Sequence, residues 1–176
     1  MSHSGSTTKA HLLSSRSGSN SVRAVVQRVT EARVRIGGPD SSQRLAGEIG
    51  PGLLVLLGVG RDDGPDDVAY VVGKIREMRV FEGEAGRQMD RSVTDTGGAV
   101  LVISQFTLYG DIRKGRRPAF DAAAPAEDAR ALYESVVREL RAAQVPVATG
   151  EFQAMMRVEL VNDGPVTILI DSKRGF

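Results

Sequence analysis

Two short polar motifs contain the residues of this sequence best suited to chemistry. The first is Ser104-Gln105-Phe106-Thr107, which directly follows the apolar run at 99–103. Polar residues that leave the end of a buried strand often reach a ligand crevice. The second is Asn162-Asp163-Gly164-Pro165-Val166-Thr167, between two strand-like segments. On spacing alone, the plainer interpretations are turn hydrogen bonds for the first motif and a hairpin turn for the second.

A third candidate is a basic segment in which Arg113, Lys114, Arg116 and Arg117 surround one glycine. Arginine can bind phosphate through two hydrogen bonds at once, so this segment suits an RNA backbone. A solvated loop is the plainer interpretation. On spacing alone, Arg28 is a surface charge, and Met155 and Met156 are residues of the core.

The residues that are missing narrow the chemistry. The chain has no cysteine and two histidines, and both histidines, His3 and His11, lie in a Ser/Gly-rich amino-terminal stretch. The folded body is therefore expected to lack both residue types, which excludes a Ser-His-Asp triad, a Cys-His dyad and a histidine-ligated zinc site. No metal ligand cluster and no cofactor are expected. Chemistry would have to use hydroxyls, carboxylates, lysine, backbone groups or the substrate itself.

Composition is that of a soluble globular protein, with 176 residues, 41% of them hydrophobic and 26% charged. No apolar run approaches the roughly 20 residues of a membrane-spanning helix, and no secretory signal is recognisable. The absence of cysteine favours a cytoplasmic protein. The formal net charge is +1. Because the amino-terminal stretch contributes Lys9 and Arg16, the body carries about −1, which argues against non-specific coating of nucleic acid but permits a local basic patch.

The hydrophobic pattern indicates the elements that must position these residues. Residues 1–22 are expected to be a disordered tail or tag, and one domain is expected over 23–176. One α/β domain, mostly sheet with two covering helices, is expected. Strands are expected at 23–29, 32–36, 45–49, 52–59, 99–103, 146–152, 155–161 and 165–171, helices from 62–67 to 78 and over 126–143, a turn at 37–40 and a Gly-rich loop at 83–98.

Taken together, SQFTL at 104–108 and NDGPVT at 162–167 closely resemble the two signature motifs of the D-aminoacyl-tRNA deacylase (D-tyrosyl-tRNA deacylase) family. Further matching segments are AVVQRV at 24–29, GPGLLVLLGV at 50–59, RRPAF at 116–120 and ALYESVV at 131–137, so the resemblance covers about residues 23–171. The sequence departs from the family at Val22, where the family pattern begins with Met, and at Ala119, where relatives often carry Ser. The second departure puts a hydroxyl role at position 119 in doubt.

The resemblance implies a fold and an assembly. The expected fold is α/β, a single domain of mixed, mostly antiparallel and barrel-like β-sheets covered by two helices. The expected assembly is a homodimer with active sites at the subunit interface. Gly164 and Pro165 would form a cis chiral gate presented to the partner's pocket, with Asn162 in the same motif and Arg28 as the anchor. Residues 104–107 would line the site, mainly through their backbone.

The implied activity is hydrolysis of the ester bond of D-aminoacyl-tRNA, and of mischarged glycyl-tRNA, with L-aminoacyl-tRNA rejected at the gate. Backbone N–H groups near Gln105, Phe106 and Thr107 could stabilise the oxyanion, at ~3–4 kcal/mol per donor. The adjacent ribose 2′-hydroxyl could activate water, and the basic segment at 113–117 would contact tRNA. Two alternatives stay open. One is an esterase that uses Thr107 or Ser104 with Lys114 or Asp111, and the other is a non-catalytic RNA-binding dimer.

Overall fold

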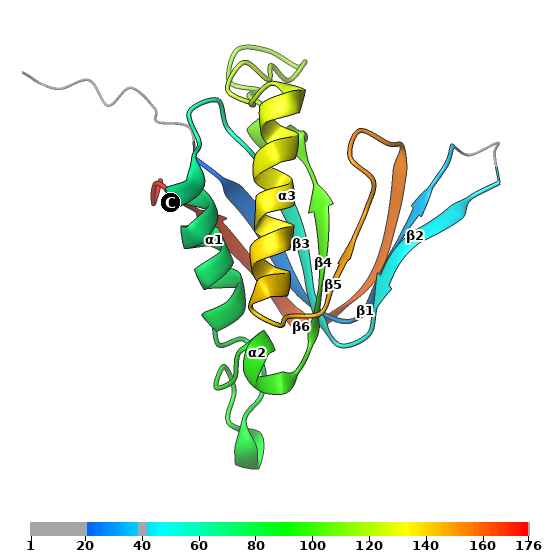
Figure 1. Ribbon diagram of the computed structural model, residues 1–176, viewed down its shortest axis with the longest axis vertical. Coiled ribbons are helices and arrows are strands. Elements are labelled where there is room, and N and C mark those ends of the chain that lie inside the picture. Colours follow the sequence, from blue (N-terminus) through cyan, green and yellow to red (C-terminus); the bar gives the residue numbers. More distant parts are fainter. Residues whose placement is uncertain (1–20, 39–41, 176) are drawn as a thin grey trace, which may run out of the picture.

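The computed structural model describes residues 21–38 and 42–175 (Figure 1). The expected tail up to residue 20, and positions 39 and 40 of the expected turn, lie outside the described residues. Ser21 and Val22, which precede the expected domain boundary, are buried. The backbone N–H of Val22 donates to Ser172 Oγ at 2.9 Å, so the packed part of the chain includes both residues.

In the described part of the chain, six strands and three α-helices make up the domain. Their bounds are β1 (Arg23–Ile36), β2 (Arg44–Ile49), β3 (Gly52–Gly58), α1 (Pro65–Glu77), α2 (Val93–Thr96), β4 (Ala99–Ser104), α3 (Ala126–Ala142), β5 (Val147–Thr149) and β6 (Met156–Asp171), with short 3-10 turns η1 (Glu84–Gly86) and η2 (Phe106–Tyr109). None of the helices in the described ranges is long and apolar enough to span a membrane.

The sheet is mixed and strongly curled. Its order is β2-β1-β3-β4-β5, and β6 pairs with β1. β1 runs antiparallel to its neighbours, whereas β3–β4 and β4–β5 are parallel. Gly47 of β2 lies so close to β5 that a Cβ there would come within 2.7 Å of the Thr149 carbonyl oxygen. The two ends of the strand order therefore meet, and the expected barrel-like α/β fold is confirmed.

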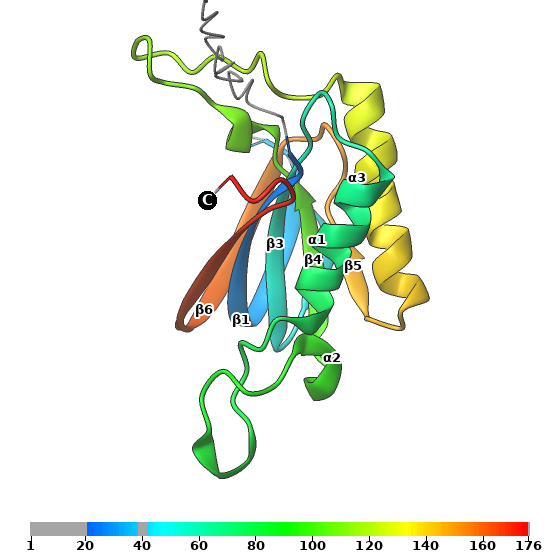
Figure 2. The same ribbon diagram turned by 90° about the vertical axis from the view of Figure 1, so that its left-hand side faces the viewer.

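Two hydrophobic cores hold the sheet. The larger lies between the sheet and helices α1 and α3, which cover the same face (Figure 2). The smaller fills the inside of the curl. Alternate residues of β3 serve the two cores, with Leu53 and Val55 toward the helices and Leu54 toward the curl. This explains why β3 is an unbroken apolar run in the sequence.

The structure corrects three element predictions. The segments at 23–29 and 32–36 form one strand, because register shifts between Gln27 and Glu31 bend β1 without ending it. The expected loop at 83–98 contains α2, a third helix, whose first turn is capped by reciprocal hydrogen bonds between Ser92 and Asp95. The third correction concerns β6 and is described with the site below.

Candidate active site

The first motif leaves the sheet where β4 ends. Ser104 pairs with Leu57 of β3, and the backbone N–H of Gln105 donates to the Leu57 carbonyl at 2.8 Å. The chain then turns into η2, which carries Phe106 and Thr107 to the surface. Phe106 is 57% exposed although it is a large apolar residue.

Two of the three expected backbone donors have no acceptor among the residues that the structure describes. The Gln105 N–H is occupied by Leu57, so the expectation that it serves a substrate oxygen is wrong. The N–H groups of Phe106 and Thr107 stand at the start of a 3-10 turn, where no preceding carbonyl can accept them. Neither has an acceptor within residues 21–38 and 42–175. The side-chain amide of Gln105 donates to the Thr107 hydroxyl, which leaves that oxygen already engaged.

A cation stacked on a buried tyrosine fixes the far end of η2. The Arg23 guanidinium lies 4.7 Å from the centre of the Tyr109 ring, and its Nη1 donates to the Leu108 carbonyl at 3.4 Å. Arg23 also pairs with Asp171 at 3.6 Å. Burial, with the Asp63 carboxylate adding to it, raises the pKa of Tyr109 well above its usual value. Neither Arg23 nor Tyr109 was identified from the sequence, because no motif marks a residue that acts through packing.

An apolar cavity of about 640 Å³ opens beside the first motif. Its polar edge is Ser104 and Gln105, and Phe106 borders it. Met155 and Met156 line it as well, and Met155 is 74% exposed. The assignment of Met155 to the core is therefore wrong. The remaining lining is mostly apolar and comes from Leu57, Val59, Ile103, Ala123, Ala124, Ala126, Ala129, Phe152, Gln153, Ala154 and Val158.

The second motif is a bulge within one strand, not a hairpin turn. Both halves of β6 pair with β1 in the same direction: Asn162 pairs with Val29, and Thr167 with Gln27. β6 thus advances five residues while β1 advances two, and three residues of β6 loop out. Asn162 Nδ2 closes this loop by donating to the Arg28 carbonyl at 2.9 Å and to the Val166 carbonyl at 3.2 Å.

Gly164 and Pro165 occupy the exposed part of the bulge. Their peptide bond is cis, and Gly164 has a φ of 131°. A Cβ on Gly164 would lie 2.8 Å from Val166 Cγ2 and 3.0 Å from Arg28 Nη2. Glycine is therefore required here both by the backbone conformation and by the space.

Arg28 connects the bulge to the body of the protein. It is buried, not a surface charge. Its Nε donates to the Asp163 carbonyl at 3.2 Å and lies 3.0 Å from the Asp163 carboxylate. Its Nη1 donates to the carbonyl of Val80, in the connection after α1. One guanidinium thus joins two segments that are distant in sequence.

The two motifs lie apart in a single chain. Ser104 pairs with Leu57, which pairs with Ala24 near the start of β1, whereas Asn162 pairs with Val29. Ala24 and Val29 are five residues apart on β1, which corresponds to ~17 Å along the strand. One chain by itself therefore does not bring the first and second motifs to one substrate.

The basic segment is an exposed loop closed by a short antiparallel bridge between Asp111 and Ala119. Arg113 Nη2 lies 2.6 Å from an Asp111 carboxylate oxygen. The hydrogen bonds from Arg113 hold the pKa of Asp111 far below its usual value. Lys114, Arg116 and Arg117 are exposed, and no ion pair involves them within the described part of the chain. Three of the four expected phosphate contacts are thus unengaged.

Among residues 21–38 and 42–175, no group of three or more His, Cys, Asp or Glu side chains could hold a metal ion. The chemistry that this geometry supports is the binding of a mostly apolar group in the 640 Å³ cavity, beside two N–H groups that can donate hydrogen bonds to a negatively charged oxygen.

Comparison with known proteins gives consistent matches. A sequence model of the family described as D-Tyr-tRNA(Tyr) deacylase matches residues 25–171. A protein of Koribacter versatilis named D-aminoacyl-tRNA deacylase is 57% identical over 155 residues, which is 88% of this chain and 100% of that protein. A protein of the same name from Heliobacterium modesticaldum is 54% identical over 154 residues, 88% of this chain and 99% of that protein.

Two solved structures have the same fold. One, titled c-Myc DNA Unwinding Element Binding Protein, has a TM-score of 0.77 and 40% identity, and the match covers 84% of this chain and 97% of that one. The other, titled as a probable eukaryotic D-amino acid tRNA deacylase, has a TM-score of 0.71 and 18% identity, covering 86% of this chain and 99% of that one. Because its identity is only 18%, the second match supports the fold assignment alone.

Proposed function

Because the chain belongs to the D-Tyr-tRNA(Tyr) deacylase family, we propose that it hydrolyses the ester bond of D-aminoacyl-tRNA and releases the free D-amino acid and tRNA. It is an enzyme of the carboxylic ester hydrolase class. The observation that carries this proposal is the pair of free N–H groups of Phe106 and Thr107 at the edge of a 640 Å³ cavity. Such donors suit the oxygen that becomes negative when an ester is attacked.

The reaction needs little help from side chains, because an aminoacyl ester is already activated. A water oxygen attacks the ester carbonyl carbon, and the carbonyl oxygen becomes an oxyanion that accepts hydrogen bonds from the N–H groups of Phe106 and Thr107. The C–O bond to the ribose 3′-oxygen then breaks, and that oxygen takes up the proton that the attacking water gives up. The adjacent 2′-hydroxyl of the substrate positions the water. Each backbone donor contributes ~3–4 kcal/mol to stabilising the transition state.

The geometry disfavours an esterase with a hydroxyl nucleophile. Thr107 Oγ1 already accepts from Gln105, and Asp111, the carboxylate suggested as its base, is held ionised by Arg113. A carboxylate with a lowered pKa is a weak general base. Thr107→Ala should therefore keep substantial activity, and no covalent acyl-enzyme should form at Ser104 or Thr107.

We further propose that the active unit is a homodimer in which Gly164 and Pro165 of one subunit complete the site of the other. This is supported by the ~17 Å separation of the two motifs within one chain and by the apolar surface of β6. That strand pairs with β1 and exposes four large apolar side chains: Leu160, Val161, Ile168 and Leu169. An exposed apolar strand at a sheet edge is a surface that a partner would cover.

In this arrangement the bulge acts as the chiral gate. Its carbonyl oxygens accept hydrogen bonds from the substrate α-ammonium, so that the side chain of a D-residue points outward and that of an L-residue points into the gate. Rejection is then steric and nearly independent of side-chain identity. Glycine has no side chain and should pass, so glycyl-tRNA should be a substrate. Lys114, Arg116 and Arg117 of the exposed loop are proposed to contact tRNA phosphates.

Single-turnover hydrolysis tests the activity. D-tyrosyl-tRNA and glycyl-tRNA should be cleaved, and L-tyrosyl-tRNA should resist. Salt-dependent tRNA binding without cleavage of any ester would instead identify a non-catalytic RNA-binding dimer.

Subunit mixing tests the shared site. Phe106→Pro removes one donor and Gly164→Val obstructs the gate, so each variant homodimer should have little activity on D-tyrosyl-tRNA. A mixed dimer contains one site with both an intact donor pair and an intact gate, and should regain activity. Failure to regain activity, with mixed dimers demonstrated by mass spectrometry, would refute the shared site.

A further inference from the structure

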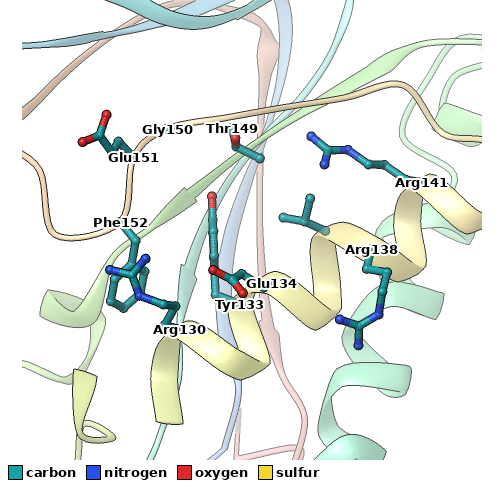
Figure 3. Close-up of a pocket in the computed structure, with 10 residues that line it drawn as sticks. Arg130, Tyr133, Glu134, Arg138, Arg141, Thr149, Gly150, Glu151 and Phe152 are labelled. Atoms are coloured by element: carbon teal, nitrogen blue, oxygen red, sulfur yellow. The ribbon is translucent and has the colours of Figure 1, made fainter. Parts of the chain in front are cut away.

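The exposed face of α3 carries an arginine cluster that the reaction described above does not use. Arg130, Arg138 and Arg141 line a cavity of about 430 Å³ between α3 and the segment 149–152. In Figure 3, Arg130 and Arg141 extend toward that segment from the two ends of the groove, whereas Arg138 points away from it. We call Arg130, Arg138 and Arg141 the α3 arginine face.

The α3 arginine face is not compensated by carboxylates in the described part of the chain. Within residues 21–38 and 42–175, none of the three lies within ion-pair distance of an acidic group. Glu151, which lines the same groove, pairs with Arg44 instead. Guanidinium groups without a carboxylate partner keep their charge and their N–H fork for an external anion, and arginine forks bind phosphate oxygens well.

Most of their hydrogen-bond donors also lack an acceptor among the described residues. A guanidinium has five N–H donors in a planar fork. Arg138 uses Nη2 for a 2.7 Å bond to Ser135 Oγ, and Arg141 uses Nη2 for a 3.3 Å bond to the Val147 carbonyl. Arg130 stacks over the Phe152 ring at 4.8 Å, which fixes the plane of its guanidinium. Groups held in this way can bind a phosphate with two hydrogen bonds.

The groove meets the 640 Å³ cavity beside the first motif, which we call the reaction cavity, at one shared residue. Phe152 lines both the 640 Å³ cavity and the α3 groove. A polynucleotide whose terminal residue occupies the reaction cavity would pass Phe152 and meet Arg130 first. Arg141 lies eleven residues further along the helix, ~17 Å away.

We propose that the α3 arginine face binds backbone phosphates of the tRNA acceptor arm, next to the aminoacylated end in the reaction cavity. The proposal rests on the proposed function, since it assigns a binding surface to that substrate. Glu134 also lines the groove, between Arg130 and Arg141, and its carboxylate repels phosphate. The phosphates therefore bind at the two ends of the groove and not at its middle.

The test compares a large and a small substrate. The variant Arg130→Gln/Arg141→Gln is assayed on D-tyrosyl-tRNA and on D-tyrosyl-adenosine, which has the ester but no acceptor arm. For the tRNA substrate, KM should rise at least tenfold with kcat within about twofold. The slope of log affinity against log salt should fall by about 1.5–2, the loss expected for two phosphate contacts. Hydrolysis of D-tyrosyl-adenosine should not change, which also shows that the variant is folded.

A matched control and two single variants complete the test. Lys74→Gln/Arg87→Gln removes two exposed cations from α1 and the α1–α2 connection, and should leave both substrates unaffected. Arg130→Gln alone keeps the Arg141 bond to Val147 and should lower the salt slope by about one. Glu134→Gln should lower KM for tRNA.

The outcomes separate the two proposals. An unchanged KM and salt slope for tRNA in the double variant would overturn the role of the α3 arginine face. If the unmodified protein cleaves neither ester, the proposed function fails, and the same salt slopes from equilibrium tRNA binding still decide whether this face contacts RNA.

Discussion

Arg28 Nε lies 3.0 Å from the carboxylate of Asp163 while Arg28 Nη1 donates to the Val80 carbonyl. A buried cation of β1 thus holds an exposed bulge to the segment that follows α1. Lysine could supply the charge, but its single ammonium group could not donate to Asp163 and Val80 with the same geometry, because only the guanidinium is a planar fork of donors.

Arg28→Lys should therefore loosen the bulge that we propose as the chiral gate. Hydrogen bonds to charged groups contribute about 1.5–3 kcal/mol each, and the half-exposed Asp163 places this pair toward the lower end. We expect urea unfolding to show a loss of about 1–3 kcal/mol and the D/L ratio of kcat/KM to fall at least tenfold. Arg33→Lys, on the exposed part of the same strand where Arg33 pairs with Glu159 at 3.6 Å, is the control and should change neither quantity.

Gly164→Ala should damage the gate by a different route. The φ of 131° disfavours any side chain, and the new Cβ would press on Val166 and Arg28. The cost in stability should be about 1–3 kcal/mol, measured by thermal or urea unfolding, with a lower rate on D-tyrosyl-tRNA. Gly50→Ala is the matched control, since a Cβ there meets nothing within 4 Å. Equal effects of both substitutions would contradict a special role for Gly164.

Phe106→Pro tests the oxyanion donor directly. Proline removes the N–H and is well suited to the first residue of a helical turn, so the fold of η2 should survive. Loss of one oxyanion donor typically lowers kcat by about 10²–10³. Phe106→Ala keeps the N–H but removes the ring, and should affect KM more than kcat. Should proline lower kcat no more than alanine does, the Phe106 N–H is not a catalytic donor.

The carboxyl group of Asp63 should lower the free energy of unfolding as pH rises from about 4 to 6. Burial raises the pKa of its carboxyl from 3.8 to about 6; the Gly60 N–H opposes this shift and the Asp67 carboxylate adds to it. In that window the native state binds more protons than the unfolded state, so this group disfavours folding once it ionises. Asp63→Asn keeps an acceptor for Gly60 and removes the charge. Its unfolding free energy relative to the unmodified protein should therefore increase from pH 4 to pH 6.5, as measured by urea unfolding, and a constant difference would contradict this.

Elements with a strong hydrophobic periodicity were predicted correctly from the sequence. Features that depend on how strands pair were not. The apolar run of β3 and the helical spacing of α3 were correct because each follows from local burial. The bulge at Asn162–Thr167 looked like a hairpin turn, since turn residues favour both outcomes. Only the pairing of both flanking segments with β1 distinguishes the two.

The same limit applies to the site. The donor roles of the Phe106 and Thr107 N–H groups stay a prediction from the motif. The occupation of the Gln105 N–H by the Leu57 carbonyl could not be predicted, because it depends on the parallel neighbour strand. Met155 carried no sequence signal for exposure, because an apolar residue at a cavity edge has the same pattern as one in a core. Arg28 was identified by family resemblance only, since nothing local indicates a buried arginine.

β1 contains both arginines on which the proposed site depends: Arg23, which holds η2, and Arg28, which holds the bulge. A one-residue slip in a strand moves every side chain to the opposite face. Deleting a single residue between Arg23 and Arg28 would therefore turn one of the two side chains to the opposite face of the sheet, even if the other kept its place. Length changes in this short stretch should therefore abolish function, so the spacing of β1 constrains the evolution of this protein as well as the identity of the two arginines.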